Sequence, residues 1–163
     1  MPTKYEGSPV RRRALDAYIK LTRATNAVAS RLEPPLSSAG LSPRQLGVLE
    51  ALLHLGSLSQ RSLSEKMLCS PANITVLIDQ LETGGLVIRQ QDPEDRRVNR
   101  IAMTRAGEKK IRSVFEAHVD RITILMGSLT SREQTLLADL CRKLGLSAKN
   151  APTGKGDDQN SKK

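Results

Sequence analysis

The fold is decided by the stretch from Ser59 to Thr104, which reads SQRSLSEKMLCSPANITVLIDQLETGGLVIRQQDPEDRRVNRIAMT. It predicts two short helices joined by a turn, followed by a two-stranded β-hairpin with a basic tip. The second helix has clear ends, because Ser70 can cap its first turn and Pro71 suits the first helical position. The glycine pair at 84–85 ends it. Its buried face is predicted from four apolar residues at helical spacing: Ile74, Leu77, Ile78 and Leu81.

The opposite face of this second helix carries small and amide side chains instead of the Lys and Glu of an ordinary solvated face. Small residues let a helix sit deep in the DNA major groove, and Asn or Gln can pair with the N6/N7 edge of adenine. Two short helices in this order indicate a helix-turn-helix whose second helix reads the groove; the alternative is an ordinary helical hairpin in a small bundle. The predicted DNA-binding residues of this helix are Ser70, Pro71, Ala72, Asn73, Thr75, Val76 and Gln80.

The hairpin that follows favours the DNA-binding interpretation. Its strands are predicted at 86–88 and 98–103, on either side of a polar tip. Arg96 and Arg97 stand where the hairpin projects furthest, and a guanidinium there can enter the minor groove or bind phosphate. Asp95 is predicted to orient an arginine, because its own carboxylate would be repelled by phosphate. The alternative is a solvated charged loop, since such hairpin tips are common.

Together these segments resemble the MarR family of winged-helix regulators. The resemblance is carried by 68–75 and 81–87, and by the family's wing signature, Asp-x-Arg ahead of Leu-Thr-x-x-Gly. Asp95 and Arg97 match the first part of that signature, whereas Met103 replaces the usual leucine. The resemblance extends from about Arg11 to Leu146. It implies a homodimeric, sequence-specific regulator of transcription on double-stranded DNA, often a repressor, which suits a palindromic or pseudopalindromic operator.

The expected fold class is mainly α with a small β-hairpin wing: a winged helix-turn-helix with terminal dimerisation helices. Residues 1–10 are expected to form a flexible arm. The winged helix-turn-helix domain is expected to span 11–146, and 147–163 to be a disordered tail that buries too little to offset its chain entropy. Within the domain, the DNA-binding lobe is assigned to 41–104 and the dimerisation helices to 11–33 and 105–146.

The terminal helices carry more apolar seam than one small winged domain can cover, with spacings of three and four residues typical of helix pairing. We therefore expect them to pair with each other and with a second copy of the chain; the alternative is a monomer that covers its own seams. Two prolines, Pro34 and Pro35, are expected to end the first helix. Gly145 is expected to end the last one.

Composition limits the choice of partner. The net charge of +9 and the pI of about 10 favour an anionic partner, either nucleic acid or an acidic membrane surface. No stretch approaches the roughly 20 apolar residues that span a bilayer, and no apolar signal core is seen at the N-terminus. Two cysteines do not make a disulfide framework. We expect a soluble, cytoplasmic protein with no membrane partner.

The sequence gives little support for catalysis or for binding of a cofactor or a metal. There is no nucleophile–base–acid set, phosphate loop or zinc-type cysteine pair, so we predict no enzyme activity, no cofactor and no metal site. A winged-helix module that binds protein instead of DNA remains the alternative function. Cys69 precedes the second helix and could act as a redox switch, although a small residue in a tight turn is the plainer interpretation. Cys141 is expected in the core. A small-molecule effector is compatible with the resemblance, but the sequence does not identify it.

Overall fold

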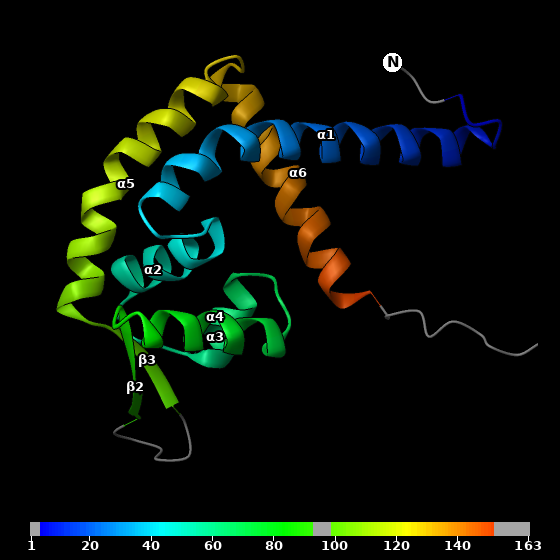
Figure 1. Ribbon diagram of the computed structural model, residues 1–163. Coiled ribbons are helices and arrows are strands. Elements are labelled where there is room, and N and C mark those ends of the chain that lie inside the picture. The colour runs from blue at the N-terminus through cyan, green and yellow to red at the C-terminus, as the bar shows by residue number, and fades with distance from the viewer. Residues whose placement is uncertain (1–3, 93–98, 152–163) are drawn as a thin grey trace, which may run out of the picture.

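The computed structural model describes residues 4–92 and 99–151, which form a mainly helical molecule with a small antiparallel sheet (Figure 1). The fold class predicted from the sequence, a winged helix-turn-helix, is confirmed. In chain order the elements are α1 (Pro9–Ser38), α2 (Pro43–Leu55), β1 (Leu58–Ser59), α3 (Gln60–Lys66), α4 (Pro71–Thr83), β2 (Val87–Gln91), β3 (Asn99–Met103), α5 (Arg105–Met126) and α6 (Ser131–Asn150).

The sheet has three strands in the order β1-β3-β2, all antiparallel. Strands β2 and β3 form the predicted hairpin, with Val87 opposite Met103 and Gln91 opposite Asn99. The short strand β1 was not predicted; it pairs Leu58 with Ile101 at the other edge of β3. It joins the end of α2 to the start of α3, so the wing is hydrogen-bonded to the helix-turn-helix through the sheet.

The core fills the lobe between α2, α3, α4, the sheet and the first turns of α5. Strand and helix contribute together, since Val87, Ile101 and Ile111 are each fully buried. The largest fully buried side chains of the lobe are Leu49, Leu63, Ile74, Ile78, Leu81, Ile101, Ile111, Val48 and Val87. This core fixes α4 and the hairpin relative to each other.

Two predicted helix ends were wrong. Helix α1 continues through Pro34 and Pro35 to Ser38. Two residues later, Gly40 turns the chain away with a φ of +73°, and the Leu41 amide donates to the Leu36 carbonyl over 3.0 Å. Leu36 and Leu41 are both 2% exposed, so burial of this apolar pair offsets the hydrogen bonds that the prolines lack.

Helix α6 likewise passes Gly145, the predicted end, and reaches Asn150. A glycine inside a helix costs only about 1 kcal/mol relative to alanine, which one favourable contact offsets. Here the missing side chain makes room for a neighbour, because a Cβ at Gly145 would lie 2.8 Å from Cδ1 of Leu68. The predicted tail therefore begins as helix, and the predicted flexible arm gives way to α1 at Pro9.

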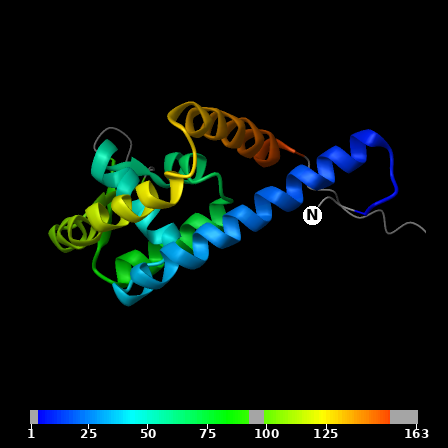
Figure 2. The same ribbon diagram turned by 90° about the horizontal axis from the view of Figure 1, so that it is seen from above.

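The N-terminal half of α1 and the whole of α6 lie outside the core. Figures 1 and 2 both show the N-terminal half of α1 extending well beyond the lobe. In both views α6 follows the end of α5 and also lies outside the lobe. None of the residues of α6 is buried. Its large apolar side chains are exposed instead, among them Leu136, Leu140 and Leu144, and Tyr18 on α1 is 65% exposed.

Candidate nucleic-acid interface

Helix α4 is delimited by the residues that the sequence indicated. The Ser70 hydroxyl accepts a hydrogen bond from the Asn73 amide over 3.2 Å, and Pro71 occupies the first helical position. At the other end Gly85 adopts a φ of +68°, and the Leu86 amide donates to the Leu81 carbonyl over 2.9 Å. The four apolar residues predicted to face the core, Ile74, Leu77, Ile78 and Leu81, are all buried. The opposite side of α4 is therefore free to face a partner.

The turn before α4 is held by its own hydrogen bonds. The Cys69 amide donates to the Ser64 carbonyl over 3.2 Å, and the Ser64 hydroxyl donates back to the Cys69 carbonyl over 2.9 Å. Leu68 between them adopts a φ of +48°, a conformation usually left to glycine. These contacts set the angle between α3 and α4, as a helix-turn-helix requires.

Every predicted DNA-binding residue of α4 lies within the described structure. Ser70, Pro71, Ala72, Asn73, Val76 and Gln80 are exposed, and Thr75 is half-buried. Ala72 and Val76 are four residues apart and share the face opposite the buried one. Val76, with no polar group, is 54% exposed on that face.

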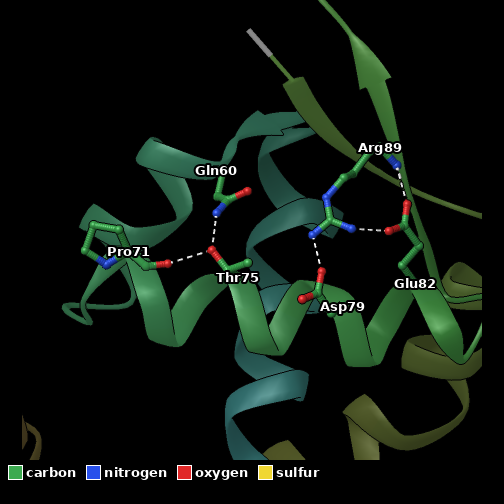
Figure 3. Close-up of polar contacts among 6 residues, drawn as sticks. All are labelled: Gln60, Pro71, Thr75, Asp79, Glu82 and Arg89. Carbon is green, nitrogen blue, oxygen red and sulfur yellow. Dashed lines mark hydrogen bonds and ion pairs between the residues drawn. The ribbon is translucent and has the colours of Figure 1, made fainter.

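Two of these residues hydrogen-bond to neighbouring helices. The Thr75 hydroxyl accepts from Nε2 of Gln60 on α3 over 2.5 Å and donates to the Pro71 carbonyl over 2.8 Å (Figure 3). The Gln80 side-chain oxygen accepts from Nε2 of Gln45 on α2 over 3.3 Å. Thr75 and Gln80 therefore lie at the flanks of α4, while Ala72 and Val76 lie between them.

The sequence interpretation missed an ion-pair cluster that joins the wing to α4. Arg89 on β2 donates from one guanidinium nitrogen to Oδ1 of Asp79 over 2.5 Å, and from another to the Glu82 carboxylate (Figure 3). The Arg89 amide also donates to Oε1 of Glu82 over 3.0 Å. The hydrogen bond to Asp79 is the largest cause of a raised pKa at Arg89, with the charges of both carboxylates adding to it. A clue was present in the sequence, because acidic residues three apart share one side of a helix.

A second arginine supports the base of the wing. Arg100 on β3 donates to Oδ2 of Asp92 over 2.9 Å and to the Ser57 carbonyl over 2.9 Å. These contacts join β3 to the loop after α2 and to the residue that follows β2. Asp95, Arg96 and Arg97, the predicted wing-tip residues, lie outside the described residues.

The cysteines and histidines offer no cluster. Among residues 4–92 and 99–151, no group of three or more His, Cys, Asp or Glu is placed to hold a metal ion. Cys69 is half-buried in the turn, and Cys141 is exposed on α6, so the expectation that Cys141 belongs to the core was wrong for the single chain. No helix in this part of the chain is long and apolar enough to cross a membrane.

Comparisons with known proteins, by sequence and by structure, point to one family. The model of the MarR family matches residues 41–98. The Bacillus subtilis HTH-type transcriptional regulator MhqR is 29% identical over 137 residues, which cover 84% of this chain and 94% of MhqR. The uncharacterized HTH-type transcriptional regulator YsmB of the same organism is 32% identical, over 67% of this chain and 75% of YsmB. The crystal structure of a MepR-like protein complexed with pseudoligands is similar at 30% identity and a TM-score of 0.64, over 86% of this chain and 95% of that one. The chain therefore belongs to the MarR family of DNA-binding transcriptional regulators.

Proposed function

We propose that this regulator is a homodimer that represses transcription by binding a palindromic or pseudopalindromic operator. The observation that carries the proposal is the exposed face of α4, with Ala72 and Val76 at its centre and the wing tied to its side by Arg89. Two such helices, related by a two-fold axis, would enter successive major grooves about 34 Å apart. The wing-tip pair Arg96 and Arg97 would contact the flanking minor grooves, with Asp95 orienting one of them.

Dimerisation is supported by the apolar side chains that the single chain leaves uncovered. Leu136, Leu140 and Leu144 recur every four residues on α6 and are 53–58% exposed. A cavity of about 470 Å³ separates this stripe from α1, with Tyr18 among its lining residues. Contiguous apolar surface of this kind marks an interface, and a second copy offers the same stripe in return.

The dimer is tested by Leu140→Glu, with Thr135→Glu on another face of α6 as the matched control. A carboxylate at an interface between copies is desolvated, so Leu140→Glu should halve the mass measured by light scattering and abolish cooperative operator binding. Thr135→Glu should leave both unchanged. A wild-type chain that is already monomeric at micromolar concentration contradicts this part of the proposal.

Operator binding is tested by selecting duplexes from random DNA and measuring their affinity at several salt concentrations. Counterion release predicts that affinity falls steeply with added salt, and a specific site should exceed random duplex by at least about a thousandfold. Replacing both Arg96 and Arg97 by alanine should weaken operator binding by roughly 1–3 kcal/mol per arginine. A winged-helix module that binds only protein, the alternative function, would show neither the salt dependence nor the duplex preference.

The sign of regulation follows from a reporter placed behind the selected operator. Occupation of an operator that overlaps a promoter excludes RNA polymerase, so deleting the regulator should raise reporter expression. Reporter expression that falls on deletion would identify an activator instead.

A small-molecule effector forms the last part of the proposal. An apolar cavity of about 370 Å³ lies between α1, α5 and α6, and its lining includes Val28, His118 and Leu137. The similar MepR-like protein, whose crystal structure is of a complex with pseudoligands, supports this part of the proposal. A panel of small apolar compounds should contain ones that raise the melting temperature and release the operator. Val28→Trp, which fills the cavity, should lose that response.

A further inference from the structure

The acidic residue Asp79 occupies an unexpected place for a DNA-binding helix. It lies three residues after Val76 and seven after Ala72, so it shares their exposed face of α4. Its side chain is 57% exposed. A carboxylate that faces duplex DNA is repelled by phosphate, and an uncompensated one on this face would weaken binding.

Arg89 compensates this charge from the wing. Its side chain is 27% exposed, and its guanidinium lies between the carboxylates of Asp79 and Glu82 (Figure 3). A planar guanidinium that donates in two directions is fixed in rotation, which a single ammonium contact does not achieve. The backbone amide of Arg89 is bonded to Glu82 as well, so both the main chain and the side chain of this residue are held by α4.

This attachment helps to set the direction of the wing, together with the pairing of β1 with β3 and the contacts of Arg100. Strand β2 continues from Arg89 to Gln91, beyond which the chain leads to the tip. The attachment to α4 therefore lies in the middle of β2, two residues before the strand ends. A change in angle at Arg89 would displace the tip arginines relative to the groove that α4 enters.

We propose that Arg89 is a positioning residue for DNA binding, which aligns the wing with α4 through Asp79 and Glu82 and makes no contact with DNA itself. The inference rests on the proposed operator binding and adds a residue to it. Because its guanidinium is engaged by two carboxylates, Arg89 contributes no phosphate contact. Loss of Arg89 should therefore lower affinity whether or not the replacement keeps a positive charge.

The first experiment compares Arg89→Gln and Arg89→Lys with the wild type on the selected operator. Both variants should bind about tenfold more weakly, because neither side chain can donate a rigid fork to two carboxylates. The slope of log affinity against log salt should be the same for the two variants, because the charge at position 89 makes no contact with DNA. A slope smaller by about one unit for Arg89→Gln, with near wild-type affinity for Arg89→Lys, would show that Arg89 binds phosphate directly and would overturn the proposal.

The second experiment uses Asp79→Ala, for which the two explanations predict opposite signs. Removing a negative charge from the DNA-facing side should tighten binding if Asp79 acts only by repulsion. If Asp79 instead holds Arg89, the variant should bind about tenfold more weakly, and the double variant with Arg89→Gln should lose no more than either single one. Unchanged or tighter binding by Asp79→Ala overturns the proposal, even if Arg89→Gln fails to fold.

A matched control comes from Arg112 and Glu108, an exposed ion pair on α5 with an N–O distance of 2.8 Å. Arg112→Gln removes the same charge as Arg89→Gln and should leave operator affinity within about twofold. Failure of the role proposed for Arg89 can be distinguished from failure of operator binding. A wild type with no duplex preference contradicts operator binding, whereas a specific wild type with an unaffected Asp79→Ala variant contradicts only the role of Arg89.

Discussion

Leu68 shows how a single residue can carry strain in the turn of the helix-turn-helix. Within residues 4–92 and 99–151, it is the only non-glycine residue with a positive φ, +48°. The left-handed conformation costs an L-residue roughly 1–2 kcal/mol, because Cβ approaches the following carbonyl oxygen. The strain persists because the hydrogen bonds between Ser64 and Cys69 require a sharp turn at this position.

Two substitutions at Leu68 separate this strain from the loss of the side chain. Leu68→Ala and Leu68→Gly both remove the contact with Gly145, but only glycine relieves the conformation. We expect the glycine variant to be more stable than the alanine variant by about 1 kcal/mol. Urea unfolding followed by circular dichroism measures the difference. Equal stabilities would mean that the turn relaxes in both variants.

Gly107 is required by a close approach of two backbones. A Cβ at this position would lie 2.1 Å from the Leu86 carbonyl oxygen and 2.8 Å from Cγ of Met103. Thr104 holds α5 at this spot, since its hydroxyl accepts from the Gly107 amide over 3.0 Å and donates to the Gly85 carbonyl over 2.7 Å. The Thr-x-x-Gly pattern of the sequence thus joins α5 to the end of α4.

We expect Gly107→Ala to destabilise the protein by about 1–3 kcal/mol or more, because the nearest atom, the Leu86 carbonyl oxygen, belongs to the backbone and cannot move aside cheaply. Thermal unfolding measures the change. Ser113→Ala, on the exposed side of α5, serves as the control and should stay within about 0.5 kcal/mol of the wild type. A Gly107→Ala variant as stable as this control would show that α5 can shift away from Leu86.

At the scale of elements, the conformation of the chain at the C-terminal end of α4 decides how the helix passes into β2. Its last turn closes with two glycines in different conformations, since Gly84 has a φ of −76° and Gly85 a φ of +68°. Only the second needs to be glycine. The Leu86 amide that follows bonds back to the Leu81 carbonyl, which turns the chain directly into β2.

The two glycines therefore give a matched pair of substitutions. Gly85→Ala should destabilise the protein by roughly 1 kcal/mol or more, because alanine resists the left-handed conformation. Gly84→Ala should be nearly neutral, since its Cβ would lie 3.4 Å from the nearest atom, the Gln80 carbonyl oxygen. Chemical denaturation of both variants tests the difference, and equal losses would contradict this account of the helix end.

At the scale of the whole molecule, His118 lies where α1, α2 and α5 meet. It lines the cavity beside α1 and a second one beside α2. Its Nδ1 atom is buried and has no hydrogen-bond partner in the structure. Burial lowers the pKa of His118 from the ordinary value of 6.5, and the charge of Arg121 lowers it further.

The lowered pKa of His118 makes the folded protein less stable at acidic pH. The folded state holds His118 neutral at pH values where the unfolded chain already binds a proton, so folding stability is full above pH 6.5 and decreases as the pH falls toward the folded pKa. His118→Gln should lose less stability than the wild type between pH 7.5 and pH 5.5. Melting temperatures of the two proteins across this range test the prediction, and parallel curves would contradict it.

The amino-acid sequence by itself determined the class of fold and the boundaries of α4. Local signals suffice there, because the cap at Ser70, the proline that follows and the glycines at the end act through their immediate neighbours in the chain. The buried face of α4 was predictable for the same reason, since helical spacing alone brings its apolar residues together.

The tertiary structure alone decided which polar residues meet. Hydrogen-bonded side chains lie far apart in the sequence: Arg89 and Asp79 are ten positions apart. Gln60 and Thr75 are fifteen positions apart, and Gln45 and Gln80 thirty-five. Such pairs depend on the angle between α4 and its neighbours, which no local spacing encodes. The passage of α1 through Pro34 and Pro35 has the same origin, because burial of Leu36 against the lobe overrides the local preference of proline to end a helix.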